Sequence, residues 1–245
     1  MSKERVGGHH EQLPSRHFLG DFYLDRRAEL KLSGRESLEY VRYLHARGTK
    51  LLMMGNHRSN ADAPVLEHTL EKNGFVDLSS NIVFLLGQKL KSSPGTNFFS
   101  MAYSHIDVWP PTMKAETREE RTNAIGMAKQ SLRAVREHLG QGKIVTIFPE
   151  GTRTRNGQMY PFNPQVIKYA DEEDTYVIPF ALSGTEDIWP VQSLVPSYRH
   201  NTAQVNIGNP LLVRDYVSKN DREGYQQFTE CIQSQVEELY KAISE

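Results

Sequence analysis

The sequence predicts an α/β fold in which helices cover both faces of a mostly parallel sheet. Short apolar runs alternate along the chain with segments of helical periodicity, which is the pattern expected for such a sheet. The 245 residues are 38% hydrophobic, enough for one sizeable core, and no break in composition indicates a second domain. We therefore expect a single domain over residues 15–245, preceded by a polar, disordered tail at residues 1–14.

The first helix is expected at residues 35–46. Ser33 and Glu36 have the spacing of a capping box, and Gly48 follows the last helical residue as a stop signal. The apolar run at residues 51–54 comes next in the chain. It is short and uninterrupted, so it predicts a buried strand rather than a surface helix.

Two helices and a strand are expected in the middle of the chain. A helix at residues 62–72 precedes the run at residues 82–86, which is too short and too apolar for a surface helix and predicts a strand. Thr117 and Glu120 have capping-box spacing at the start of a long helix that Gly140 ends. Apolar residues recur along that helix at three-four spacing: Ile125, Ala128, Leu132, Val135 and Leu139.

Three strands and a helix complete the expected order. Apolar runs predict strands at residues 144–148, 176–182 and 203–207, with helical segments between them. Because these strands alternate with helices, their connections favour parallel pairing. The last helix carries its apolar residues on one face: Tyr225, Phe228, Ile232, Val236, Leu239 and Ile243.

The most informative polar segment is Asn-His-Arg-Ser-Asn-Ala-Asp at residues 56–62, directly after a predicted strand. His57 and Asp62 are five positions apart, so the carboxylate could accept a hydrogen bond from the Nδ1–H of the ring. That contact would fix the tautomer and leave Nε2 able to take a proton from a hydroxyl. The alternative is a capped helix start, with Ser59 or Asn60 as the N-cap and His57 as a passive loop residue.

A second polar segment, Phe-Pro-Glu-Gly-Thr-Arg-Thr-Arg at residues 148–155, also follows a predicted strand. Its proline, glycine and two arginines predict a rigid cationic turn. The guanidinium groups of Arg153 and Arg155 present donors that match an anionic group such as phosphate. A structural turn held by a salt bridge to Glu150 is the alternative.

Together the two segments resemble the glycerophospholipid acyltransferase family, which includes the glycerol-3-phosphate and 1-acyl-glycerol-3-phosphate acyltransferases. Residues 56–62 match the family's first block, Asn-His-x-x-x-x-Asp, and residues 148–153 match its third block, Phe-Pro-Glu-Gly-Thr-Arg. The fourth block, an apolar strand ending in proline with a glycine nearby, resembles residues 177–180 and Gly184. The resemblance covers residues 51–185, with the blocks in the family's order.

The chain departs from the family at two places. The second block, isoleucine-aspartate-arginine, corresponds to residues 105–108, where Val108 stands in place of the arginine. After the third block, many members have phenylalanine-lysine-x-glycine, whereas residues 162–165 are Phe-Asn-Pro-Gln. These changes do not touch the first block, but they leave the identity of the acceptor open.

The resemblance implies an O-acyltransferase that uses His57 as the base and Asp62 as its orienter, without a covalent intermediate. Its donor would be acyl-CoA or an acyl-carrier protein, with no other cofactor. Its acceptor would be glycerol 3-phosphate or a lysophospholipid. Arg153, with Arg155 or Lys89, would hold the acceptor's phosphate. The full set of implied substrate-binding residues is Glu150, Gly151, Thr152, Arg153, Arg155 and Lys89.

Two other classes of function fit the same residues. His57, Asp62 and Glu150 could bind a metal in a hydrolase, although the segment lacks a second histidine at ligand spacing. The chain could also be a catalytically silent module that binds lipid or acyl carrier. We favour the acyltransferase and expect no metal site.

The composition of the chain limits which partners and which cellular location we expect. A net charge of −1 gives no reason to expect nucleic acid, and a single cysteine, Cys231, fits a reducing cytoplasm. No apolar run approaches the roughly 20 residues of a membrane span. Peripheral contact with the inner membrane face is the expected alternative to a span. Its candidates are residues 16–27, which mix aromatic with basic side chains, and the apolar loop at residues 188–198. For residues 16–27 we favour the alternative of a helix packed on the domain, because the apolar stripe is short. The loop has two alternative roles, covering an edge of the core or lining a hydrophobic ligand site.

Overall fold

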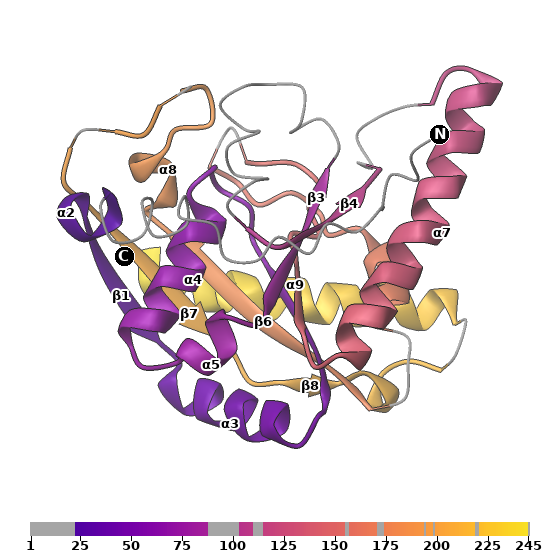
Figure 1. Ribbon diagram of the computed structural model, residues 1–245, viewed down its shortest axis with the longest axis horizontal. Coiled ribbons are helices and arrows are strands. Elements are labelled where there is room, and N and C mark those ends of the chain that lie inside the picture. Colours follow the sequence, from indigo (N-terminus) through magenta and orange to yellow (C-terminus); the bar gives the residue numbers. More distant parts are fainter. Residues whose placement is uncertain are drawn as a thin grey trace, which may run out of the picture.

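The computed structural model describes residues 23–87, 103–109, 115–154, 157–170, 174–193, 195–197, 199–218 and 221–244. Within these residues, an eight-stranded sheet crosses the molecule, with helices packed on both of its faces (Figure 1). This is the predicted α/β architecture. The predicted tail at residues 1–14 lies outside the described residues.

The strands and helices follow the expected alternation. The strands are β1 (Ala28–Ser33), β2 (Lys50–Gly55), β3 (Ile82–Gly87), β4 (His105–Val108), β5 (Ile144–Ile147), β6 (Thr175–Ser183), β7 (Asn201–Ile207) and β8 (Leu211–Leu212). The helices are α2 (Asp25–Arg27), α3 (Arg35–Ala46), α4 (Asp62–Lys72), α5 (Val76–Ser79), α7 (Arg118–Gly140), α8 (Thr185–Ile188) and α9 (Arg222–Ser244), with 3-10 helices η3 (Pro164–Tyr169) and η4 (Val213–Asp215).

The strand order is β1-β7-β6-β2-β5-β3-β4, and β8 pairs with β6. β2 lies between β5 and β6 and is parallel to both, whereas β7 and β8 run antiparallel to β6. Met54 is in register with Ile147 of β5 and Pro179 of β6. The three central strands therefore end at the same edge of the sheet, where their following loops meet.

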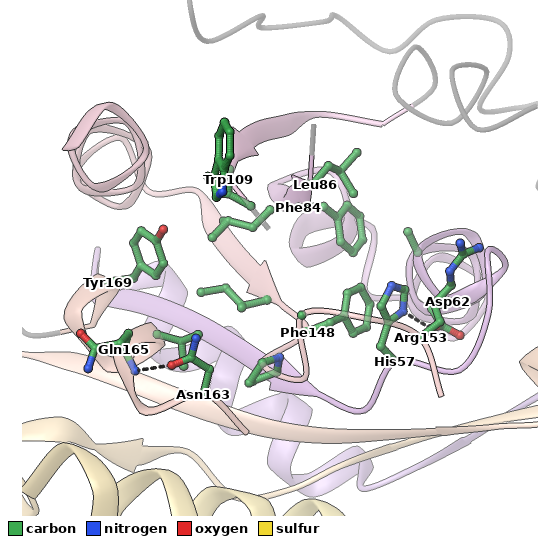
Figure 2. Close-up of a pocket in the computed structure, with 18 of the residues that line it drawn as sticks. His57, Asp62, Phe84, Leu86, Trp109, Phe148, Arg153, Asn163, Gln165 and Tyr169 are labelled. Atoms are coloured by element: carbon green, nitrogen blue, oxygen red, sulfur yellow. Dashed lines mark hydrogen bonds and ion pairs between the residues drawn. The ribbon is translucent and has the colours of Figure 1, made fainter. Parts of the chain in front are cut away.

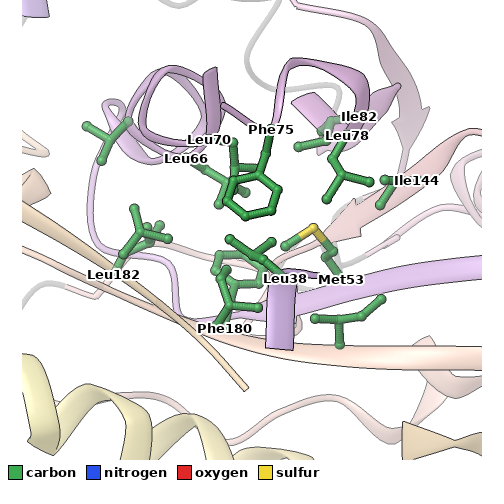
Figure 3. Close-up of a cluster of buried hydrophobic side chains, with 14 of the residues drawn as sticks. Leu38, Met53, Leu66, Leu70, Phe75, Leu78, Ile82, Ile144, Phe180 and Leu182 are labelled. Carbon is green, nitrogen blue, oxygen red and sulfur yellow. The ribbon is translucent and has the colours of Figure 1, made fainter. Parts of the chain in front are cut away.

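Alternate residues of β2 enter two separate cores. Leu51 and Met53 pack under α3, α4 and α5, together with Phe75 and Phe180 (Figure 3). Leu52 and Met54 face the opposite core, to which α7, α9 and η3 contribute. Because both faces are covered, the strand is continuously apolar from Leu51 to Met54, as a buried parallel strand should be.

The N-terminal part of the fold corrects the prediction. Ser33 does not cap α3, because it is the last residue of β1, a strand that was not predicted and that pairs in parallel with β7. Gly34 is the N-cap, with φ of 75° and no side-chain cap. A Cβ there would lie 2.0 Å from the Ile207 carbonyl oxygen, so a larger residue would force the two segments apart.

The long helix α7 begins where it was predicted to begin, but a shorter part of it than predicted packs against the core. Thr117 and Glu120 form the complete capping box. Val135 and Leu139 are buried, but Ile125 is 58% exposed, so the apolar stripe meets the core in the second half of the helix. No helix in the described ranges combines the length and apolar content needed to cross a membrane.

The two candidate membrane segments are described in part. Residues 16–22 lie outside the described residues. In the loop at 188–198, Ile188 and Trp189 are buried in the same hydrophobic cluster as Leu51 and Met53. These two side chains therefore cover an edge of the core, which is one of the two roles that their composition allows.

Candidate active site

The two polar segments meet at the edge where β2 and β5 end. His57 follows β2 by two residues, and Phe148 directly follows β5. Gly55, the last residue of β2, is closely covered, since a Cβ there would lie 2.5 Å from the Phe180 ring. A glycine at this position lets the chain turn over Phe180 and carry His57 to the edge.

His57 and Asp62 form a hydrogen-bonded pair. His57 Nδ1 lies 2.7 Å from Asp62 Oδ2, and the same oxygen accepts from the backbone N–H groups of Arg58 at 2.7 Å and Ser59 at 3.0 Å. Asp62 Oδ1 accepts from Thr185 Oγ1 at 2.5 Å. Four donors, from His57, Arg58, Ser59 and Thr185, thus surround this buried carboxylate.

The pair sets the chemistry of the ring. Because Asp62 is surrounded by donors and acts as an acceptor, we assign the Nδ1 proton to His57 and leave Nε2 as the acceptor. The His57 side chain is 23% exposed, and no described residue hydrogen bonds to its Nε2. Ala61 is the N-cap of α4, so neither Ser59 nor Asn60 has that role.

Glu150 joins the two segments. Its Oε1 accepts from the His57 backbone N–H at 2.7 Å, across 93 residues of sequence. Its Oε2 accepts from Thr154 Oγ1 at 3.1 Å and from the Tyr160 backbone N–H at 2.8 Å. The Thr154 N–H in turn donates to the His57 carbonyl at 2.8 Å. Burial raises the pKa of Glu150, although the three donors act in the opposite direction.

A pocket of about 450 Å³ opens beside His57. His57, Asp62 and Arg153 lie at one end of it, and Gln165 and Tyr169 lie at the other (Figure 2). Its walls between the ends are mostly apolar. They include Phe84, Leu86, Trp109, Leu132 and Phe148. The pocket therefore combines a long apolar lining with a polar, cationic end at the His–Asp pair.

The cationic end is organised by Asn60. Arg153 Nη1 donates to Asn60 Oδ1, and both residues line the pocket. Arg153 belongs to the third block and Asn60 to the first, so this contact is a further bond between the segments.

This arrangement agrees with the comparisons to known proteins. The Acyltransferase family model matches residues 30–183, which include both polar segments, strands β2 to β6 and most of β1. The chain belongs to the acyltransferase family. The predicted membership of an acyltransferase family is thereby confirmed.

Two relatives place this acyltransferase among known proteins. A 1-acyl-sn-glycerol-3-phosphate acyltransferase of Limnanthes douglasii is 28% identical over 88 residues, which are 34% of this chain and 31% of that protein. The match thus spans about a third of the plant protein. The crystal structure of the 1-acyl-sn-glycerophosphate (LPA) acyltransferase PlsC from Thermotoga maritima has a TM-score of 0.58 at 20% identity, covering 92% of this chain and 78% of that one. This second likeness is one of fold.

The acyltransferase brings most of the predicted site residues together. His57, Asp62, Gly151 and Arg153 line the pocket, and Glu150 lies behind them with its oxygens directed at protein donors. Thr152 lies in the same turn, outside the pocket lining. The predicted helpers Arg155 and Lys89 fall outside the described residues.

Sequence reasoning missed the turn after β6 as part of the acyltransferase site. Asn56 Nδ2 donates to the Leu182 carbonyl at 2.9 Å, and the Leu182 N–H donates to Asn56 Oδ1 at 2.8 Å. The Arg58 guanidinium binds Glu186 and, at 3.0 Å, the Gly157 carbonyl. The apolar strand and glycine of the fourth block marked the region, but no local pattern shows which side chains it would support.

Proposed function

We propose that this acyltransferase moves a fatty acyl group from a thioester donor to a hydroxyl of a glycerophosphate-type acceptor. The donor is acyl-CoA or an acyl-carrier protein, and the acceptor is glycerol 3-phosphate or a lysophospholipid. The observation that carries the proposal is the 2.7 Å contact of His57 Nδ1 with Asp62 Oδ2, at the end of an apolar pocket. The acceptor class is also supported by the activities for which the Limnanthes and Thermotoga relatives are named.

The reaction needs one base. His57 Nε2 takes the proton of the acceptor hydroxyl as its oxygen attacks the thioester carbonyl carbon. The tetrahedral intermediate then breaks its carbon–sulfur bond, and the imidazolium returns the proton to the thiolate. Asp62 stabilises the imidazolium through Nδ1. Acyl group and proton are thus both transferred, and the base is regenerated.

Transfer is direct in this proposal, without an acyl-enzyme. Ser59 is the hydroxyl nearest in sequence, but it donates to the Thr185 carbonyl at 2.8 Å and accepts from the Ala61 N–H at 2.8 Å. Ser59 is buried, and its hydroxyl is held by these two backbone groups instead of being activated by His57 as a nucleophile would be.

The apolar walls of the pocket suit the acyl chain of the donor, and its cationic end suits the phosphate of the acceptor. The lining of Phe84, Leu86, Trp109 and Leu132 matches an acyl chain. Arg153, held by Asn60 beside the pair, offers a guanidinium to the acceptor's phosphate. We further propose that the enzyme acts in the cytoplasm, in peripheral contact with the inner membrane face, because a lysophospholipid acceptor would be presented there. Flotation of the protein with anionic vesicles tests this location.

A screen of acceptors with one acyl-CoA, followed by mass spectrometry, tests the function. We expect an ester product with one glycerophosphate-type acceptor, unchanged by a strong chelator and lost in His57→Ala. His200→Ala is the matched control, because His200 is exposed and lies outside the pocket lining. Chelator-sensitive release of free fatty acid would favour the hydrolase, and a bound thioester that never turns over would favour a binding module.

A further inference from the structure

The Asp62 carboxylate is held by two parts of the chain that are far apart in sequence. Three donors from residues 57–59 converge on Oδ2, and the fourth donor, Thr185 Oγ1, holds Oδ1. Thr185 is 123 residues away from Asp62. A carboxylate bound at one oxygen can swing about its own axis, whereas one bound at both oxygens cannot do so without breaking a bond.

The turn that carries Thr185 is closely packed. Gly184 has φ of 75°, and a Cβ there would lie 2.1 Å from the Thr202 carbonyl oxygen of β7. Thr185 has no exposed surface, and its own carbonyl accepts from Ser59 Oγ at 2.8 Å. Thr185 therefore touches the first block twice, through its hydroxyl and through its backbone.

The direction of the hydroxyl bond follows from its partner. Asp62 is an acceptor for three N–H groups, so the hydroxyl of Thr185 donates its proton to Oδ1. At 2.5 Å this is a short, charge-assisted hydrogen bond, a class that is stronger than a bond between neutral groups.

We propose that Thr185 is a positioning residue of the His57–Asp62 pair. Its hydroxyl fixes Oδ1 of Asp62, so that Oδ2 stays directed at His57 Nδ1 during proton transfer. Thr185 does not line the pocket and touches neither substrate in this account, so it acts through Asp62 alone. The inference rests on the proposed function for its kinetic test, but the geometry of the pair can be measured without turnover.

Serine and cysteine at position 185 form a matched pair, because both lack the threonine methyl and differ in the hydroxyl. We expect Thr185→Ser to keep near-normal turnover and Thr185→Cys to lower kcat roughly 10-fold, since S–H is a weak donor. The KM values for donor and acceptor should stay within about twofold, because no substrate contact is lost. Thr185→Val should behave like Thr185→Cys.

Thr175→Val controls for the loss of a buried hydroxyl. Thr175 has no exposed surface, and its Oγ1 has no hydrogen-bond partner among the described residues. This variant should keep the kcat of the natural enzyme. Equal kcat in Thr185→Ser and Thr185→Cys would overturn the inference, as would a loss that appears in KM instead of kcat.

The NMR resonance of the His57 Nδ1 proton separates this inference from the proposed function. We expect a downfield signal in the natural protein and in Thr185→Ser, shifted or broadened in Thr185→Cys. A signal that is unchanged in the cysteine variant overturns the positioning role. If the natural protein shows the signal but acylates no acceptor, the proposed function fails. The positioning role is then still decided by the Nδ1 signal in Thr185→Ser and Thr185→Cys.

Discussion

The imidazole of His57 lies face to face with the phenyl ring of Phe148, with ring centroids 4.4 Å apart and planes inclined by 14°. Phe148 in turn stacks on Phe84 at 6.4 Å and meets Phe180 edge-on at 6.0 Å. Phe148, the first residue of the third block, therefore packs against one face of the His57 ring. It also connects His57 to the aromatic side chains of the core.

Replacing Phe148 by leucine should lower turnover. An aromatic pair contributes about 0.5–1.5 kcal/mol beyond its buried area, so we expect kcat to fall by roughly 3- to 10-fold as the ring of His57 loses its support. Phe162→Leu is the control, because Phe162 is buried outside the pocket lining. Steady-state kinetics and thermal unfolding of both variants separate activity from stability. If Phe148→Leu loses as much stability as Phe162→Leu and keeps its kcat, the stacked rings contribute to packing alone.

His57→Ala should lower kcat by at least ~10² with the fold intact, the usual range for a lost general base. Asp62→Asn should be milder. Its amide oxygen can still accept from the three N–H donors while its NH₂ faces the Thr185 hydroxyl, so the tautomer is kept and the charge is lost. Kinetics and circular dichroism of the purified variants check both expectations. A near-normal rate in His57→Ala would remove the catalytic assignment.

Arg153→Lys should raise the KM for the acceptor and leave the KM for the donor nearly unchanged. A lysine cannot reproduce the planar fork of donors, one of which is bound to Asn60. Arg133→Lys on the exposed side of α7 is the control. Initial rates with each substrate varied in turn give the two KM values. An effect confined to donor KM or to melting temperature would assign Arg153 to another role.

Glu150→Gln should reduce stability by about 1–3 kcal/mol, because one amide oxygen cannot serve the donors that now bind both carboxylate oxygens. Burial raises the pKa of Glu150, so the folded state holds its proton more tightly than the unfolded chain does. The group's contribution to the free energy of unfolding therefore falls as pH rises from its ordinary value of 4.5 through the raised pKa, and levels off above it.

The difference in stability between the natural protein and Glu150→Gln should thus narrow as pH rises across that window. Urea unfolding at a series of pH values measures it, with the exposed Glu119→Gln as the control. A difference that widens with rising pH would mean that the three hydrogen bonds outweigh burial in setting the pKa of Glu150.

Much of this fold is encoded locally. The apolar runs of β2, β3, β5 and β6 and the periodicity of α9 are visible in the sequence, because a buried strand and an amphipathic helix each impose their own spacing. The Thr117 capping box was likewise predicted, since both of its partners lie within one turn. His57 and Asp62 belong to this class too: they are five positions apart, so their pairing could be inferred from the segment itself.

The contacts decided by tertiary structure join segments that have no local signal for each other. β1 was missed because its partner β7 lies more than 170 residues later, and that pairing made Ser33 a strand residue instead of a cap. The hydrogen bonds of Glu150 to the His57 backbone and of Thr185 to Asp62 also could not be predicted, because their partners are 93 and 123 residues apart. The sequence by itself determined which side chains could do the chemistry. The packing of the sheet determined which distant groups hold them in place, because only the folded chain brings the ends of β2, β5 and β6 to one edge.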